Sequence, residues 1–185
     1  RPGDLFVALK GEYTDGHAHV PDAVARSAAA CIVRRGFASD GVPRELLCGV
    51  DDPCAALGAL AAWVRRRLAC RVIAITGSIG KTTTKDILAA LLEGTYAVEK
   101  AQESFNNSIG VPLTIFRADA RTSALVAEVG ANHAGEIAGL CAILGPSDGM
   151  IVSIAPVHLE GFGSLDGIIR AKGELAAAIP PGGTL

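Results

Sequence analysis

A glycine loop between a short apolar run and a helical pattern constrains this sequence more than any other feature. Residues 72–75 form a mostly β-branched apolar run, which favours a buried strand. The glycines that follow let the backbone turn, so that N–H groups and the start of the next helix point at phosphate oxygens. The pattern predicts a phosphate-binding loop with nucleotide contacts at Thr76, Gly77, Ser78, Ile79, Gly80, Lys81, Thr82 and Thr83.

Two side chains at the end of this loop carry the expected chemistry. Lys81 is expected to reach the terminal phosphates, and the Thr82 hydroxyl is of the kind that holds Mg²⁺. The spacing is a variant, because Ile75 stands where the strict motif has its first glycine. A chance Gly-Lys-Thr in a surface turn is the simple alternative. Against it, the next helix is predicted to carry its apolar residues on one face: Ile87, Leu88, Leu91 and Leu92.

Composition indicates a globular chain with its own core. Half of the 185 residues are apolar, and a formal net charge of −2 argues against a broad basic surface for nucleic acid. No apolar run is long enough to span a membrane and no signal peptide is evident, so we expect a cytoplasmic protein. The cysteines are odd in number and lack a C-x-x-C pair, so we expect reduced core residues at Cys31, Cys48, Cys54, Cys70 and Cys141.

The order of strand and helix patterns predicts an α/β fold class with two domains. Residues 1–70 read as a small α/β domain with a connecting helix that starts at Pro53 and ends at the arginines 65–67, a triplet that reads as a solvated helix end or a binding patch. Residues 71–185 alternate strands with helices, which predicts a mostly parallel sheet. Strands are expected at 5–9, 31–33, 46–50, 72–75, 96–99, 123–129 and 150–154, and helices at 21–30 and from Ser164 to about Ile179, among others.

Two possible metal ligands follow strands of the second domain. Glu128 lies at the end of one predicted strand, and His158 lies just beyond another. Taken singly, each has a simpler reading, as a buried structural carboxylate or an ordinary loop histidine. Because parallel strands end at one edge of a sheet, however, we expect Thr82, Glu128 and His158 to meet there as metal and phosphate ligands.

Lys172 is a further candidate in the last predicted helix. Its neighbours at three or four residues' distance are Ile168, Ile169, Leu175 and Ala176, so it is predicted to leave from the apolar face. Burial there favours the neutral amine. A lysine that snorkels to the surface is the alternative that periodicity leaves open.

Four segments, in this order, resemble the Mur ligases, the ATP-dependent amide ligases of peptidoglycan precursor synthesis. They are residues 76–84, 104–114, 128–137, and 158–164 with 171–174. Residues 2–11 and 15–17 are similar to that family's UDP-substrate domain. The resemblance implies a partial UDP-substrate-binding domain in residues 1–70 and a partial central P-loop ATPase domain in residues 71–185. It also implies UDP-substrate contacts at Lys10, Gly11, Asp15, Gly16 and His17.

The resemblance implies ATP and two Mg²⁺ ions as cofactors. Lys81 would bind the ATP phosphates, while Thr82 and Glu128 would hold one Mg²⁺. A second Mg²⁺ would be held by His158 and by Lys172, carbamylated by CO₂. Two asparagines, Asn106 and Asn107, would lie beside the γ-phosphate and the substrate carboxylate. The implied catalytic set is Lys81, Asn106, Asn107, His158 and Lys172.

The implied reaction joins UDP-N-acetylmuramoyl-tripeptide to D-alanyl-D-alanine. ATP would phosphorylate a carboxylate, and the amine would displace phosphate through a tetrahedral intermediate whose charge the metals and a lysine offset. Residues 132–137 and 105–107 favour the D-alanyl-D-alanine-adding type within the family. We expect a monomer, with no nucleic acid or membrane partner.

Two alternatives stay open. The first is another ligase of the superfamily, such as the diaminopimelate- or lysine-adding enzyme or a folylpolyglutamate synthase. The second is a non-catalytic P-loop nucleotide-binding module, against which Glu128, His158 and Lys172 argue jointly, because simple binding needs no second metal. Since the family's C-terminal domain has no counterpart here, we expect a fragment that is inactive alone.

Overall fold

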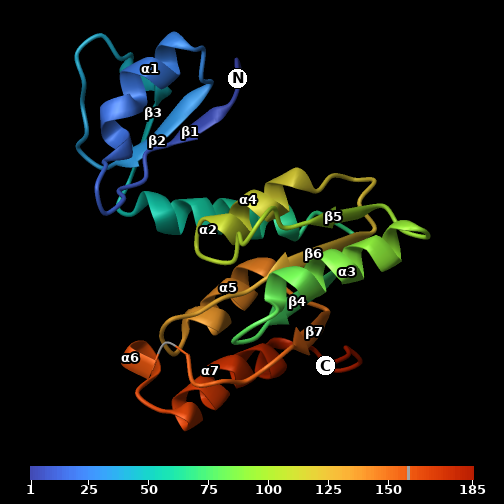
Figure 1. Ribbon diagram of the computed structural model, residues 1–185. Helices are drawn as coiled ribbons and strands as arrows, with labels where there is room; N and C mark the ends of the chain where they lie inside the picture. The colour runs from blue at the N-terminus through green and yellow to red at the C-terminus, as the bar shows by residue number, and fades with distance from the viewer. Residues whose placement is uncertain (158) are drawn as a thin grey trace. The chain divides into compact units, whose positions relative to one another are not determined.

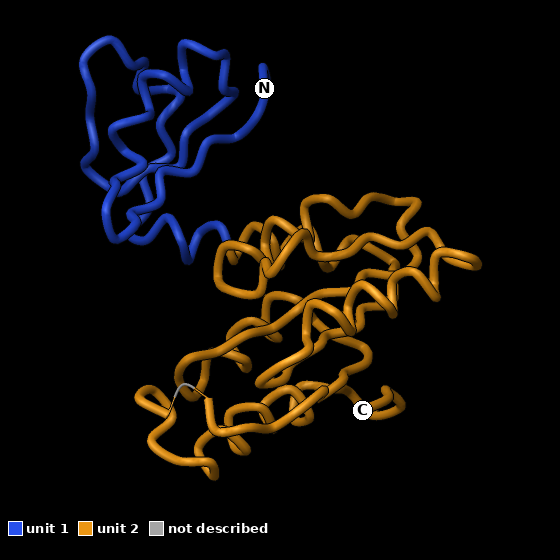
Figure 2. The backbone as a smooth tube through the Cα atoms, viewed as in Figure 1, with its two compact units in different colours: residues 1–57 blue, residues 58–185 orange. Residues whose placement is uncertain are grey.

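The chain forms two compact units, residues 1–57 and 58–185, divided inside helix α2 (Pro53–Arg65) (Figure 2). The computed structural model describes residues 1–157 and 159–185. The predicted ligand His158 therefore lies outside the described residues. None of the helices in these described ranges has the length and hydropathy that a membrane crossing requires.

The first unit is a three-stranded parallel sheet in the order β1-β2-β3. Its strands are β1 (Leu5–Val7), β2 (Ala30–Arg34) and β3 (Leu47–Val50), with helix α1 (Val20–Ala25) and the short 3₁₀ turns η1 (Gly16–His19) and η2 (Arg44–Leu46). Helix α1 stops well before the predicted residue 30. The chain turns at Ser27, whose φ of 65° lies in the left-handed region that a helix cannot continue through.

The second unit contains a four-stranded parallel sheet in the order β5-β6-β4-β7 (Figure 1). Its strands are β4 (Arg71–Thr76), β5 (Val98–Lys100), β6 (Ala124–Glu128) and β7 (Asp148–Ile151). Both sheets are parallel throughout, which confirms the predicted α/β class. The strand predicted at 150–154 starts and ends earlier, because Ser153 leaves the sheet and binds the glycine loop instead.

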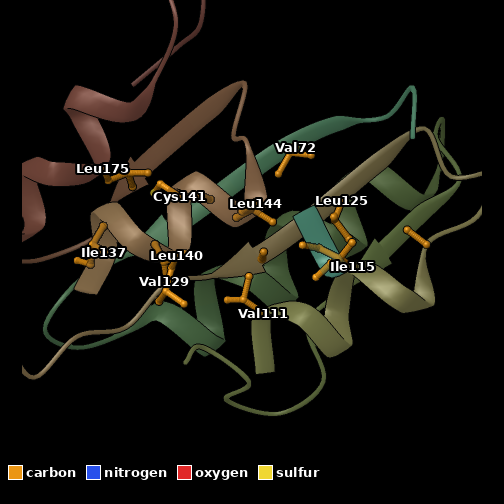
Figure 3. Packing of buried hydrophobic residues seen from close by; sticks show 14 of the residues in the cluster. Val72, Val111, Ile115, Leu125, Val129, Ile137, Leu140, Cys141, Leu144 and Leu175 are labelled. Atoms are coloured by element: carbon orange, nitrogen blue, oxygen red, sulfur yellow. The ribbon is translucent and has the colours of Figure 1, made fainter. Parts of the chain in front are cut away.

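Five further helices belong to this unit: α3 (Lys81–Glu93), α4 (Gly110–Arg117), α5 (Glu136–Leu144), α6 (Leu159–Phe162), which contacts α7, and α7 (Leu165–Ala178) itself. The main core joins the sheet to α2, α4, α5 and α7, as Figure 3 shows for labelled residues such as Ile115, Leu144 and Leu175. Helix α3 contacts β4, β5 and β6 but contributes nothing to this cluster. Since strand side chains alternate between faces, Leu125 and Ala127 serve the core while Glu128 points to the α3 side.

The apolar face predicted for α3 is wrong for two of its four residues, since Leu88 and Leu92 are half-buried but Ile87 and Leu91 are not. Ile87 and Leu91 are 58% and 75% exposed, whereas Lys85 and Ala89 are buried. The helix is thus rotated about its axis relative to the prediction, because Lys85 faces the buried Glu128 carboxylate of β6. The consequence is that a lysine occupies a core position of α3.

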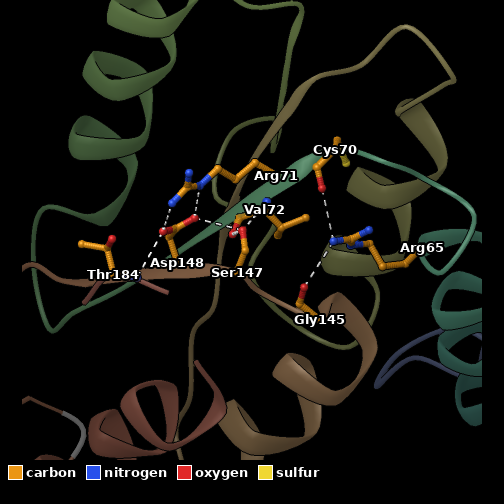
Figure 4. Close-up of polar contacts among 8 residues, drawn as sticks. All are labelled: Arg65, Cys70, Arg71, Val72, Gly145, Ser147, Asp148 and Thr184. Carbon is orange, nitrogen blue, oxygen red and sulfur yellow. Dashed lines mark hydrogen bonds and ion pairs between the residues drawn. The ribbon is translucent and has the colours of Figure 1, made fainter. Parts of the chain in front are cut away.

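Hydrogen bonds from two arginines stabilise the end of the sheet opposite the glycine loop (Figure 4). Arg65 donates to the carbonyls of Leu144 and Gly145 at 2.8 and 3.3 Å, and so caps the end of α5. Arg65, the first of the three arginines 65–67, therefore has a structural role in capping α5 and is not simply solvated at the end of its helix. The Arg71 guanidinium donates to both carboxylate oxygens of Asp148, at 2.6 and 2.7 Å, and joins the starts of β4 and β7.

None of the five cysteines, all of which lie in the described residues, forms a disulfide. Cys31, Cys70 and Cys141 are buried as predicted, but Cys48 is exposed, so the prediction of core cysteines is wrong for that residue. Burial, with the nearby Glu174 charge second, raises the pKa of the Cys141 thiol to about 11.

Candidate active site

The glycine loop connects β4 directly to α3 and is held in shape by the segment after β7. Gly80 has a φ of 89°, a backbone conformation that residues with a β-carbon adopt only with strain. Helix α3 begins at the next residue. Ser153 accepts from the Ser78 N–H through its carbonyl and from the Ile79 N–H through its hydroxyl, both at 2.9 Å. Two of the predicted nucleotide donors are therefore already engaged within the protein.

The donors that remain for an anion lie at the start of α3. The first N–H groups of a helix have no partner within it, and they carry the positive end of the helix dipole. In α3 these belong to Lys81, Thr82 and Thr83, since the N–H of Thr84 is the first to bond back, to the Gly80 carbonyl. The Lys81 ammonium folds over the loop and donates to the Gly77 carbonyl at 2.8 Å. It thus lies beside the groups that would receive a phosphate.

Glu128 ends β6 directly opposite Ile75, the second-last residue of β4. Its carboxylate is fully buried, and neither oxygen accepts a hydrogen bond from the described part of the chain. The hydroxyl oxygen of Thr76 is buried without such a partner as well. Buried polar atoms without partners cost free energy, which points to a ligand at this edge of the sheet.

Carboxylate and hydroxyl oxygens are the ligands that Mg²⁺ prefers, so Glu128 with the half-buried Thr82 fits this ion, the rest of its coordination coming from water and phosphate oxygens. Among the described residues, no three His, Cys, Asp or Glu side chains gather as a metal site. The second metal ligand predicted at His158 lies outside those residues.

Lys85 was not predicted as a site residue, yet its ammonium forms an ion pair with the Glu128 carboxylate. Its ammonium lies 3.6 Å from a carboxylate oxygen of Glu128, and the side chain is 2% exposed. It also donates to the Glu103 carbonyl at 2.7 Å. The sequence signal was the spacing of four from Lys81, which places both lysines on one side of the helix.

Lys172 of α7 is buried among Ile168, Ala171 and Leu175. The predicted apolar face is wrong for Ile169, which is exposed. Burial lowers the pKa of the Lys172 amine, and the charge of Lys81 lowers it further. The amine is therefore shifted toward its neutral form.

The two asparagines of segment 104–114 differ in what they do. The side-chain oxygen of Asn107 accepts from the N–H groups of Ile109 and Gly110, at 3.1 and 2.9 Å, and so caps α4. Asn106 lies against Gly130, just beyond β6, and its carbonyl accepts from the Gly130 N–H at 2.8 Å. Asn106 is thus tied to the Glu128 edge, while Asn107 has a structural task.

In the first unit, the predicted UDP-substrate residues form one tight loop. Lys10 and Asp15 pair as an isolated antiparallel bridge, and Gly16 approaches the Leu9 backbone too closely for any side chain. His17 is committed on both ring nitrogens: Nε2 accepts from the Arg34 N–H at 2.8 Å, so Nδ1 carries the proton toward Asp15 at 2.6 Å. Lys10 and Gly11 are exposed and remain available to a ligand.

The fold and the loop together define a class: a parallel α/β domain with a glycine loop at the start of a helix and an acidic group at the same sheet edge. A family model described as the Mur ligase middle domain matches residues 75–185. The chain belongs to the Mur ligase family.

Individual relatives show which members of the family this chain is similar to. A Haemophilus influenzae protein named UDP-N-acetylmuramoyl-tripeptide--D-alanyl-D-alanine ligase is 43% identical over 97% of this chain and 39% of its own length. A crystal structure of MurF from Acinetobacter baumannii has a TM-score of 0.90 and 39% identity, over 99% of this chain and 40% of that one. MurF ligase from Thermotoga maritima, in complex with ADP, has a TM-score of 0.87 and 34% identity, over 97% of this chain and 41% of that one. The chain spans about two fifths of the length of the curated relatives it matches.

Proposed function

We propose that this chain supplies the nucleotide and metal site, and part of the UDP-substrate domain, of an ATP-dependent ligase that joins D-alanyl-D-alanine to UDP-N-acetylmuramoyl-tripeptide. One observation carries the proposal. The buried Glu128 carboxylate, without a hydrogen-bond partner in the described residues, lies at the sheet edge where the free N–H groups of α3 begin. The names of the relatives supply the substrates.

Each residue of this edge has one task in the proposed reaction. Lys81 exchanges the Gly77 carbonyl for phosphate oxygens of ATP, and the N–H groups at the start of α3 hold those oxygens. Thr82 and Glu128 would hold Mg²⁺, which would supply charge neutralisation during phosphoryl transfer. Asn106, held against Gly130, orients the substrate carboxylate in this proposal.

The chemistry requires activation, because a carboxylate is a poor electrophile. The γ-phosphoryl group of ATP passes to a carboxylate oxygen of the tripeptide and ADP leaves. The amine of D-alanyl-D-alanine then attacks the carbonyl carbon, and phosphate departs as the amide forms. The positive groups of this edge, Lys81 among them, offset the negative charge of the tetrahedral intermediate.

Lys172 is proposed to react with CO₂ and become a carbamate, which with His158 would hold a second Mg²⁺. Only a neutral amine attacks CO₂, and burial, with the charge of Lys81 second, lowers the pKa of Lys172 in the required direction. Residues 1–70 and 71–185 remain the proposed UDP-substrate and ATP-binding domains of a monomer.

The test is a ligase assay on the protein as its gene encodes it. Phosphate release that depends on both UDP-N-acetylmuramoyl-tripeptide and D-alanyl-D-alanine is expected. Turnover with diaminopimelate, lysine or glutamate as the amine, and not with the dipeptide, would assign a sibling ligase instead. Nucleotide binding without turnover on any amine would assign a non-catalytic module and overturn the proposal.

A further inference from the structure

A single buried ammonium joins two parts of the candidate site. Lys85 of α3 lies 3.6 Å from a Glu128 oxygen, and its own hydrogen bond, 2.7 Å long, goes to the carbonyl of Glu103. Glu103 begins the loop 103–107, which ends in the two asparagines. One group therefore contacts both the proposed metal ligand and the start of the asparagine loop.

The loop needs such a contact because its backbone is strained at Glu103. Glu103 has a φ of 44°, a left-handed conformation that costs a residue with a side chain free energy unless its surroundings hold it. Beyond it, the loop is fastened by the Asn106 carbonyl, which accepts from Gly130 at 2.8 Å. Without the Lys85 bond, the strained end of the loop would lose a fastening.

The loop also has room to move. A cavity of about 440 Å³ lies between α3, the end of β5 and this loop, with Lys85, Glu103 and Phe105 among its lining residues. The other lysine on this cavity, Lys100, is partly exposed and pairs with Asp86 at 2.7 Å. Asp86 also lies 3.6 Å from Lys85. Lys100 is thus a matched lysine on the same cavity with no bond to the loop.

We propose that Lys85 is a positioning residue, which holds the asparagine loop in place and acts as the resident counter-ion of Glu128 until a metal cation arrives. The metal half of this proposal rests on the proposed function. Two cations beside one carboxylate repel each other, so Lys85 and a divalent ion compete for Glu128. A metal at Glu128 therefore weakens the ion pair between Lys85 and Glu128. It also affects the hydrogen bond from Lys85 to the Glu103 carbonyl.

The first experiment measures the loop without metal or nucleotide. In Lys85→Met, amide hydrogen exchange in residues 103–107 is expected to rise about tenfold or more, relative to the amides of β4. In the control Lys100→Met the same amides are expected to change less than about twofold. Equal exchange in wild type and Lys85→Met would overturn the positioning role.

Lys85→Met leaves a buried carboxylate unpaired, which can prevent folding. The double variant Lys85→Met/Glu128→Gln has no buried charge left at this place and is measured beside it. Fast amide exchange in residues 103–107 of the folded double variant supports the proposal. If these amides stay protected in the double variant, Lys85 does not hold the loop and the proposal is rejected.

The second experiment separates positioning from mere structural support. Removing the competing charge is expected to tighten Mn²⁺ binding about tenfold in Lys85→Met, measured by the electron paramagnetic resonance of free Mn²⁺. A purely structural lysine would leave the affinity unchanged or weaken it, and either result overturns the counter-ion role. If neither wild type nor variant binds Mn²⁺, the metal role of Glu128 fails with the counter-ion role, and the exchange data still decide whether Lys85 holds the loop.

Discussion

Asn106 is packed so closely on Gly130 that a β-carbon added there would stand 2.9 Å from the Cγ and Oδ1 atoms of the asparagine. The glycine therefore leaves just enough space for the Asn106 amide beside the end of β6. The backbone bond from the Gly130 N–H to the Asn106 carbonyl needs no such space. The side chain and the backbone of this pair can thus be separated by experiment.

Gly130→Ala is expected to displace the Asn106 amide while the loop stays folded. The clash falls on a side chain that can rotate away, so the loss of stability should be less than about 1 kcal/mol. Turnover of the complete protein should fall about as much as in Asn106→Ala, roughly tenfold or more. Thermal unfolding and steady-state kinetics measure the two effects, and a variant with wild-type kcat would show that the position of Asn106 is unimportant.

Acid should weaken the protein through Asp148. The bond from Arg71 is the main cause that lowers the pKa of this carboxyl from 3.8 to about 2, so the unfolded chain takes up a proton at higher pH than the folded one. The stabilisation is complete above about pH 5 and is lost as the pH falls toward 2. With Arg71 63% exposed, we expect about 1 to 2 kcal/mol.

The matched variant is Asp148→Asn, followed by urea unfolding at pH 7 and pH 3. It should be less stable than wild type at pH 7 and lose less stability between the two pH values. Parallel losses in the two proteins would assign the acid sensitivity to other groups.

Lys172 should take up CO₂ reversibly. With ¹³C-labelled bicarbonate, wild type is expected to show a carbamate signal in ¹³C NMR that grows as the pH rises toward the lowered pKa of the amine, because the neutral fraction grows. Lys172→Arg cannot form it and serves as the control. An identical signal in both proteins would place the carbamate on another amine.

Sequence patterns predicted the parts of this protein that depend on local signals. The apolar run before the glycines, the parallel direction of the strands and the start of α7 after Ser164 follow from neighbouring residues, and the structure has them. The Mur ligase resemblance was confirmed by the family match.

Features that depend on distant partners were missed. Apolar residues occur around much of α3, so periodicity alone did not decide which side would face β6, and Lys85 was overlooked for that reason. Helix α4 was not predicted, and the contact that helps it to begin, from the Gly110 N–H to the Asn107 side chain, leaves no mark in apolar periodicity. Nor did the sequence reveal that Ser153 would take up two N–H groups of the glycine loop, since that contact spans more than seventy residues.

The most direct test is calorimetric titration of the complete protein with ADP, with and without Mg²⁺, in wild type and in Glu128→Gln. Glutamine keeps the size of the buried side chain but removes the charge that would hold the metal. We predict that Mg²⁺ tightens ADP binding in wild type by about tenfold, and that Glu128→Gln binds ADP alone as wild type does but gains nothing from Mg²⁺. An undiminished Mg²⁺ effect in Glu128→Gln would contradict the account.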